Sequence, residues 1–178
     1  AATLRERLFI LGVRGAPAEL PAPQATHAPL GDLQDALPGM DVRVPWVTSA
    51  EVLKDIPPNA LNHTFVKHTE AVVKRFEKLG PGECDPPRRR NRLDPSRPSF
   101  TLFTGGIVGK KQARAHIHPF EPRELSPREC ARIHGFPDDW EFYGEHDSVM
   151  LQTANSVPVE LASAMGNHVA DLVESCGR

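Results

Sequence analysis

An apolar run opens the chain. Residues Arg7 to Arg14 read R-L-F-I-L-G-V-R, and the turn-forming residues Gly15 and Pro17 follow. An apolar run of this length, bounded by charged and turn-forming residues, favours a buried β-strand. A core strand so early in the chain predicts that its neighbouring strands come from elsewhere, or that the chain is part of a larger fold.

The clearest helical period lies over residues 69–79. Val72, Phe76 and Leu79 fall on one apolar face. Glu70 stands four residues before Lys74, the spacing of a helical ion pair. Before this helix the pattern predicts mostly loop, with one short helix over 49–55. After it, the alternation of apolar and polar residues over 100–104 predicts a half-buried strand.

Two helices are expected in the last third of the chain. Ser126-Pro127-Arg128-Glu129 has the form of a capping box with Pro at the first helical position. The last helix is expected to run from Pro158 to about Glu174. Its buried stripe would consist of Leu161, Met165, Val169 and Leu172 or Val173.

Composition adds loops to this picture. The chain has 178 residues, enough for one domain with a small appendage, and its 18 prolines are about twice the average share. It has no apolar run long enough for a membrane span and no charged-then-apolar leader, so no membrane association is expected. Cys84, Cys130 and Cys176 lie far apart, which favours reduced thiols and a cytoplasmic protein.

Charge is unevenly distributed. The net charge of −2 argues against a strongly basic nucleic-acid binder. Residues 85–118, however, carry eight basic against two acidic side chains, a local charge of +6, while residues 119–150 carry three basic against eight acidic, or −5. The basic segment is compatible with phosphate contacts and equally with a solvated Arg-rich loop.

Three segments favour a specific chemistry. They read R-E-R-L-F-I-L-G at 5–12, R-E-L-S-P-R-E-C-A-R-I-H-G-F-P-D at 123–138, and Q-T-A-N-S-V-P at 152–158. In this order and spacing they resemble the last three sequence blocks of the C5-cytosine DNA methyltransferases. The resemblance runs from about Thr3 to Val169, and the middle segment is its most specific part.

The resemblance also shows which parts of the family pattern are missing. Members of the family begin with a Gly-rich strand–turn–helix that holds S-adenosylmethionine, and then carry a Pro-Cys loop with the nucleophile and a Glu-Asn-Val segment. Neither these segments nor any Cys after a Pro occurs here, and Cys130 is expected to be a buried structural thiol. The chain therefore resembles a C-terminal half, either a separately encoded subunit or an excised portion, which is inactive without an N-terminal half.

The first block implies a role for two arginines. In the family a Cys thiolate adds to carbon 6 of a cytosine that has left the helix, and an always-charged donor suits the negative charge that develops on the ring. The resemblance places Arg7 against that base and Arg5 on nearby backbone or phosphate. Thr3 stands where the family has Gln. The alternative for Arg7 is an ordinary surface arginine at a strand end.

The third block implies a cofactor site. Asn155, Ser156 and Val157 match residues that line the S-adenosylmethionine pocket, while Ala154 replaces the family's Gly. Capping of the last helix by Asn155 or Ser156 is the alternative, and both roles can hold.

Between the first two blocks the family carries its target-recognition region. Thr101, Gly105 and Gly106 match a strand and loop that meet the DNA duplex. His116 and His118 are not expected to bind metal, because no further ligand stands at a matching spacing. The other candidate nucleic-acid contacts are Arg88, Arg89, Arg90, Arg92, Arg97, Lys110, Lys111 and Arg114.

The resemblance thus implies an α/β fold. A partial Rossmann-like methyltransferase sheet would contribute its opening strand (1–14) and a C-terminal segment with the cofactor-pocket edge (122–178), around a small, irregular, partly β target-recognition domain (15–121). The implied function is methyl transfer to cytosine in duplex DNA, within a cytoplasmic, nucleoid-associated restriction-modification enzyme. A non-catalytic DNA-binding module or inactive remnant, and the related tRNA methyltransferase branch, are the alternatives.

Overall fold

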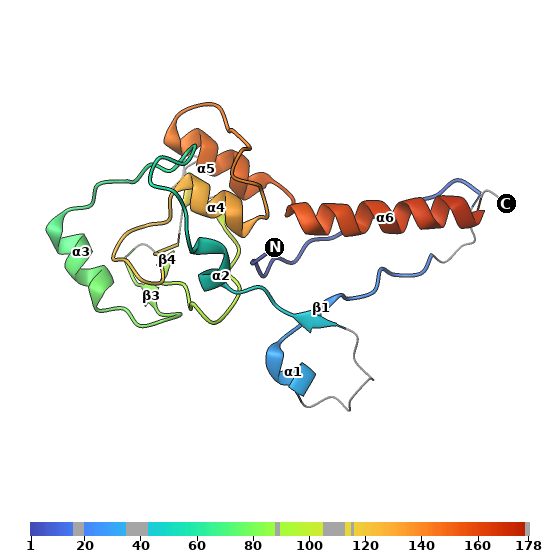
Figure 1. Cartoon of the computed structure of the whole chain (residues 1–178), viewed down its shortest axis with the longest axis horizontal. Helices are drawn as coiled ribbons and strands as arrows, with labels where there is room; N and C mark the ends of the chain where they lie inside the picture. The colour runs from blue at the N-terminus through green and yellow to red at the C-terminus, as the bar shows by residue number, and fades with distance from the viewer. Residues whose placement is uncertain (16–19, 35–42, 88–89, 105–112, 115, 177–178) are drawn as a thin grey trace. The chain divides into compact units, whose positions relative to one another are not determined.

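The chain divides into two compact units. The structure, a computed structural model, describes residues 1–15, 20–34, 43–87, 90–104, 113–114 and 116–176. The first unit consists of Ala1–Arg5 and Val47–Pro158, and the second of Glu6–Trp46 and Val159–Arg178. Figure 1 traces both units by residue number.

Short helices and hairpin-like strand pairs build the first unit. Helix α4 packs against α2 and α5, and α5 also lies beside the β5–β6 pair. Both strand pairs are antiparallel. The elements are α2 (Ser49–Leu53), α3 (Glu70–Glu77), β3 (Cys84–Asp85), β4 (Arg90–Asn91), β5 (Phe103–Thr104), β6 (Ala113–Arg114), α4 (Pro127–Ile133) and α5 (His146–Asn155).

Helix α4 lies at the centre of this unit. Almost all of its residues are buried, and Cys130 and Ile133 are fully so. The predicted structural thiol is confirmed, and burial raises the pKa of Cys130 well above its ordinary value. The main apolar cluster contains Leu53, Leu93, Leu102, Leu125, Cys130, Ile133, Met150 and Ala154.

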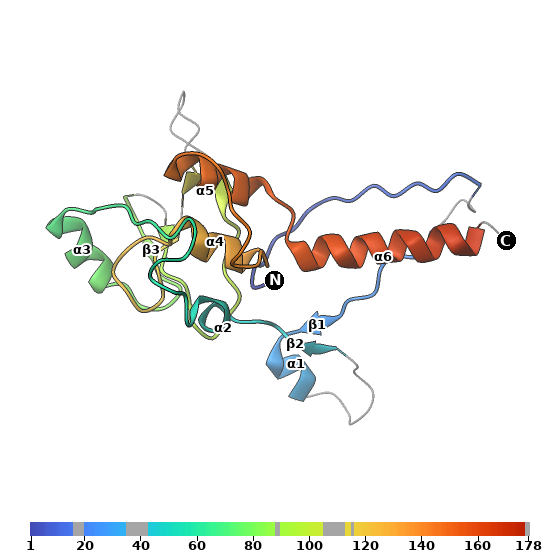
Figure 2. The same ribbon diagram turned by 45° about the horizontal axis from the view of Figure 1, so that its top comes forward.

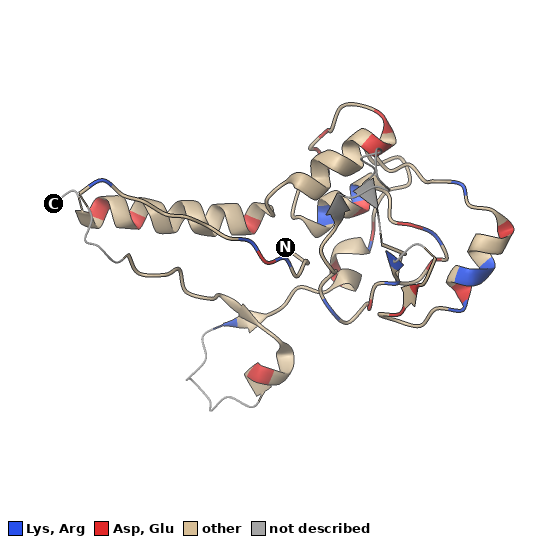
Figure 3. Ribbon diagram, turned by 180° about the vertical axis from the view of Figure 1, so that it is seen from behind, with Lys and Arg blue, Asp and Glu red and all other residues tan. Residues whose placement is uncertain are grey.

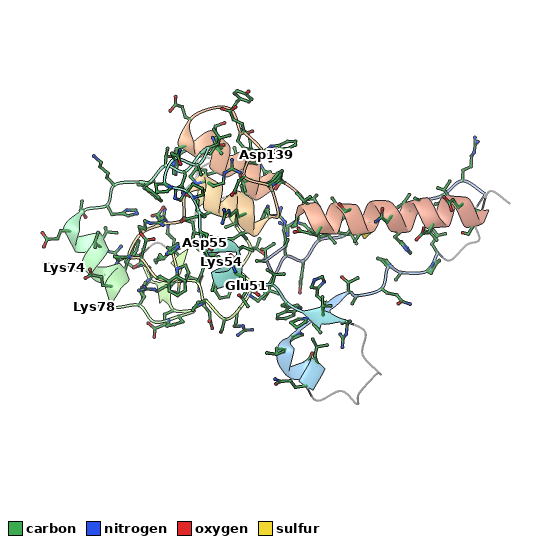
Figure 4. All side chains as sticks on the ribbon, in the orientation of Figure 1. Glu51, Lys54, Asp55, Lys74, Lys78 and Asp139 are labelled. Atoms are coloured by element: carbon green, nitrogen blue, oxygen red, sulfur yellow. The ribbon has the colours of Figure 1, made fainter. Side chains whose placement is uncertain are left out.

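The predicted capping box starts α4. The Ser126 hydroxyl accepts from the Glu129 N–H at 3.1 Å, and the Glu129 carboxylate accepts from the Ser126 N–H at 2.7 Å. A second capping box, formed by Thr48 and Glu51, starts α2 and was not predicted. Figure 4 labels Glu51 on that helix.

Helix α3 is shorter than the predicted 69–79 but follows its pattern. Phe76 is fully buried, and the Lys74 ammonium lies 2.6 Å from the Glu70 carboxylate. Lys74 and Lys78 mark this helix in Figure 4. At the end of the helix the Arg92 guanidinium donates to the carbonyls of Phe76 and Leu79, at 3.1 and 3.2 Å.

The second unit combines one long helix with a small parallel pair. Strands β1 (His27–Ala28) and β2 (Val44–Pro45) pair beside the short helix α1 (Leu30–Gln34), as Figure 2 shows. Helix α6 (Val159–Cys176) carries acidic side chains but no Lys or Arg, which is visible in Figure 3. Its predicted stripe is confirmed in register: Leu172 is buried, Leu161, Met165 and Val169 are half-buried, and Val173 is exposed.

The predicted opening strand is not found. Residues 4–13 form neither helix nor strand, and Leu8 and Ile10 are 87% and 88% exposed. A strand needs a neighbour to complete its ladder, and no described residue pairs with 6–13. For the same reason the expected partial Rossmann-like sheet is not seen in the described ranges, where every strand is two residues long. No helix among the described residues is long and apolar enough to span a membrane.

Candidate functional site

The opening residues lie beside the segment around Ser99. Thr3 forms a parallel bridge with Ser99, and the Ser99 carbonyl accepts from the Leu4 N–H at 2.8 Å. The Ala2 N–H in turn donates to the carbonyl of Ile133, the last residue of α4, at 3.1 Å. These backbone bonds fix residues 2–4 against the centre of the first unit.

Arg5 connects the first block to the third. Its Nη1 donates to the Ala154 carbonyl at 2.8 Å, across 149 positions of sequence. Ala154 lies in the last turn of α5, where unsatisfied carbonyls give the helix end a negative partial charge that a guanidinium stabilises. The contact is to a backbone carbonyl, and the role predicted for Arg5 in the assembled enzyme stays a prediction.

His134 connects the second block to the third. It is fully buried at the end of α4, and its Nδ1 lies 2.9 Å from the Ser156 hydroxyl. Because that hydroxyl donates its hydrogen to the Thr153 carbonyl at 2.7 Å, Nδ1 must be the protonated donor toward Ser156. The ends of α4 and α5 are therefore bound to each other through these two side chains.

The three predicted cofactor-site residues form the turn after α5. Asn155 ends the helix with its side chain exposed, and Val157 is 46% exposed. The Ser156 N–H donates to the carbonyls of Gln152 and Thr153. The hydroxyl of Ser156 bonds to the Thr153 carbonyl within α5 and to His134. Capping of α6 by Asn155 or Ser156 stays a prediction.

The arginines of the second block hold the fold together. Arg128 is fully buried and donates to the carbonyls of Leu61, Pro137 and Trp140 at 2.7, 2.9 and 2.5 Å. Burial is the main reason why its pKa lies below the ordinary value. This role was missed, because the neighbours of Arg128 along the helix include the charged residues Glu129 and Arg132 and give no sign of a buried guanidinium.

Arg123 and Arg132 also bind groups within the protein, chiefly carboxylates. Arg123 forms ion pairs with Glu121 and Glu129; burial opposes its charge, but these carboxylates prevail and raise its pKa. Arg132 pairs with Asp138 and donates to the carbonyl of Lys54 at 2.6 Å. Figure 4 labels Lys54 beside α2.

Two of the predicted DNA-contacting arginines are engaged within the protein. Arg90 forms a largely buried ion pair with Glu124. Arg92 donates to the carbonyls that end α3 and to that of Pro119 at 3.1 Å. Their first role in this structure is therefore structural. Arg97, in contrast, has an exposed side chain.

The other predicted DNA contacts are placed as follows. The Thr101 hydroxyl donates to the Leu4 carbonyl at 2.7 Å, so it lies beside the opening segment. The backbone of Arg114 lies in β6, but its side chain is outside the described part. Also outside the described residues are Gly105, Gly106, Arg88, Arg89, Lys110 and Lys111.

Arg7 lies in the second unit. Its side chain is exposed and donates locally to the carbonyl of Glu6. The structure brings Arg5, Thr101 and Ser156 into one region of the first unit, whereas Arg7 belongs to the second unit.

The two neighbouring histidines support backbone. Nε2 of His116 donates to the Thr101 carbonyl at 3.1 Å, while Nδ1 of His118 accepts from the N–H groups of Phe120 and Glu121. Burial lowers the pKa of both rings. Among the described residues no cluster of three or more His, Cys, Asp or Glu is arranged to hold a metal ion.

Comparison with known proteins assigns these blocks to a family. The sequence profile of the C-5 cytosine-specific DNA methylase family matches residues 1–171. Type II methyltransferase M.BbvI of Brevibacillus brevis is 32% identical over 172 residues, which are 86% of this chain and 41% of that protein. M.PspPI of Psychrobacter is 33% identical over 184 residues, covering 96% of this chain and 43% of its own length. The chain thus spans less than half the length of these relatives, and it aligns with their C-terminal part.

A shorter relative and a solved structure extend the comparison. M.AquIB of Picosynechococcus is 32% identical over 127 residues, covering 62% of this chain but 87% of its own length. A crystal structure described as a DNA modification methyltransferase encoded within an Escherichia coli prophage matches 64% of this chain and 29% of its own, with a TM-score of 0.55 and 32% identity. With residues 1–171 matched and relatives of this kind, the chain belongs to the C-5 cytosine-specific DNA methylase family.

Proposed function

We propose that this chain is the C-terminal portion of a DNA (cytosine-5)-methyltransferase, which supplies target recognition and one edge of the cofactor pocket. The hydrogen bond from Arg5 to the Ala154 carbonyl carries the proposal, because it joins the first and third family blocks across the whole chain. The bond between His134 and Ser156 supports it by adding the second block.

The turn after α5 suits an S-adenosylmethionine pocket edge. The exposed Asn155 amide can donate and accept hydrogen bonds, and the exposed Val157 side chain offers apolar contact. When bound, this cofactor supplies the methyl group. This chain would hold the 155–157 turn in place through Arg5, which binds the Ala154 carbonyl, and through His134, which binds Ser156.

We propose that Arg7 supplies charge at the flipped cytosine. A guanidinium keeps its positive charge at every physiological pH and can stabilise negative charge that develops on the ring. Arg5 would position the same segment through Ala154. On the DNA side, Thr101 and the exposed Arg97 are the described candidates for backbone contact.

An N-terminal half must provide the nucleophile and the remaining cofactor site. No Cys of this chain follows a Pro. Cys130 lies inside α4, and its burial keeps the thiol in the neutral form. The relative M.AquIB supports a two-part arrangement, because this chain covers 87% of it and only 41% of M.BbvI. A whole relative of about this size therefore exists in the family.

Reconstitution tests this function. The chain is mixed with a cognate N-terminal half, and methyl transfer from labelled S-adenosylmethionine to duplex DNA is measured; neither half alone should transfer. Arg7→Ala should lower kcat at least about a hundredfold, while Arg14→Ala, an exposed arginine at the end of the same segment, should leave it unchanged.

Two outcomes would contradict the proposal. Failure of every cognate half to restore transfer, together with salt-sensitive DNA binding by this chain, would favour a non-catalytic DNA-binding module. Methylation of tRNA but not of duplex DNA would favour the RNA branch of the family.

A further inference from the structure

We propose that His134 is a positioning residue that holds Ser156 in its ligand-binding conformation. The inference rests on the function proposed above, in which the 155–157 turn is one edge of the cofactor pocket. It concerns a side chain that reaches this turn through the Ser156 hydroxyl.

The His134 ring is rigidly held. The His134 N–H donates to the carbonyls of Cys130 and Ala131 at 3.2 and 3.1 Å, which closes the last turn of α4. Gly135 follows with φ of +81°, the left-handed conformation that commonly ends a helix. The side chain is fully buried where α4 ends.

The Ser156 hydroxyl is held from two sides. It accepts from His134 Nδ1 at 2.9 Å and donates to the Thr153 carbonyl at 2.7 Å, and Thr153 itself is fully buried. Both hydrogen bonds together fix the hydroxyl rotor and leave one lone pair of the oxygen for a third partner.

The surroundings of Ser156 explain why fixing its hydroxyl would help a ligand to bind. Its neighbours Asn155 and Val157 are exposed, and a turn of this kind would otherwise lose conformational freedom when a ligand binds. Arg5 holds the turn at Ala154 and His134 holds it at Ser156, so the turn is pre-organised on both sides. His134 should therefore affect ligand affinity through Ser156 and not the chemical step.

The test is a double-mutant cycle in the reconstituted enzyme. His134→Ala and Ser156→Ala should each raise KM for S-adenosylmethionine about tenfold at nearly unchanged kcat, and the double variant should be no worse than either alone. His134→Asn, which keeps an N–H donor near the position of Nδ1, should restore most of the affinity. Ser148→Ala, a serine on the same helix, and His146→Asn at the other end of α5 are matched controls and should change neither constant.

Two readouts do not depend on turnover. Calorimetric titration of the assembled halves with S-adenosylhomocysteine should show the same loss of affinity in both single variants. Nitrogen-detected histidine NMR of this chain should show a protonated Nδ1 at His134, with a signal that shifts in Ser156→Ala.

The outcomes separate this inference from the proposed function. Additive effects of the two substitutions, or a loss of thermal stability with unchanged ligand affinity, would overturn the positioning role. Absence of methyl transfer from the unsubstituted assembly would contradict the proposed function instead, and the calorimetric cycle would still decide whether His134 acts through Ser156.

Discussion

Residues 123–138 and residues 5–12 match two blocks of the same family, yet most of their side chains lie in opposite environments. The first stretch is buried, and its arginines are satisfied by carboxylates and carbonyls within the protein. The second has no ladder partner among the described residues and exposes Leu8 and Ile10. The comparison teaches that one block of the family can form a buried scaffold, whereas another can leave its large apolar side chains exposed.

The largest expected effect lies at Arg128. Arg128→Met keeps most of the volume but removes the donors of three backbone carbonyls, and each carbonyl that stays buried and unsatisfied costs free energy. We expect the free energy of unfolding to fall by about 3–5 kcal/mol, measured by urea denaturation with Trp fluorescence. Arg14→Met, at an exposed position, should change it by less than about 0.5 kcal/mol; equal stabilities of the two variants would break the comparison.

The second largest difference in the free energy of unfolding is expected between leucine variants of the two regions. Leu125→Ala removes a fully buried side chain from the main apolar cluster and should cost about 3 kcal/mol. Leu8→Ala should leave the free energy of unfolding of the chain nearly unchanged, because that side chain is already in water.

Residues 6–13 should matter more for binding of the N-terminal half than for the stability of the isolated chain. Leu8→Lys should weaken binding of the N-terminal half at least about tenfold, measured by titration calorimetry, because burial of residues 6–13 is expected only in the complex. A Leu8 variant that unfolds the isolated chain would show instead that this segment already has a place in the fold.

The two capping boxes sharpen the comparison at smaller scale. Ser126→Ala leaves the Glu129 N–H unsatisfied in a buried site and should cost about 1–2 kcal/mol. Thr48→Ala makes the same change at α2, where the Thr48–Glu51 pair is exposed and water can replace the hydroxyl, and should cost about 0.5–1 kcal/mol. Thermal denaturation of both variants tests the order, and a larger loss at Thr48 would contradict the central role of α4.

Acidification should produce the mildest effect within the scaffold. Burial lowers the pKa of His63 and His118 from the ordinary 6.5, so both rings are neutral when folded and the unfolded chain binds protons first as pH falls. Their contribution to stability is complete above pH 6.5 and is lost progressively below it. Urea denaturation between pH 7 and 5 should show this slope, and His118→Gln should reduce it; a slope unaffected by that substitution would exclude His118 as its source.

Local features were predictable because their partners are close in sequence. The Ser126–Glu129 box, the Glu70–Lys74 pair and the apolar stripe of α6 each depend on residues three or four positions apart. Helix α5 was missed, since its buried positions include Thr153 and Ala154 and do not form a clear apolar stripe.

The candidate site was predictable by block but not by contact. Asn155 and Ser156 were identified from the third block, whereas their support was not: Arg5 reaches Ala154 across 149 positions, and His134 reaches Ser156 across 22. No periodicity in a single sequence connects residues so far apart. Arg90 and Arg92 show the converse case, because a run of basic residues looks solvent-exposed until Glu124 and the carbonyls of α3 are placed beside it.

By itself the sequence determined the family, the capping of α4 and the faces of α3 and α6, because these depend on local spacing and on the order of short blocks. Only the tertiary structure decided which arginines are buried in the scaffold and which remain exposed, and how the ends of α4 and α5 meet at His134 and Ser156. The physical reason is that burial and hydrogen-bond satisfaction are properties of three-dimensional neighbours. For the same reason the apolar run at 7–14 predicted a strand, while the strand itself requires neighbours that no described part of this chain supplies.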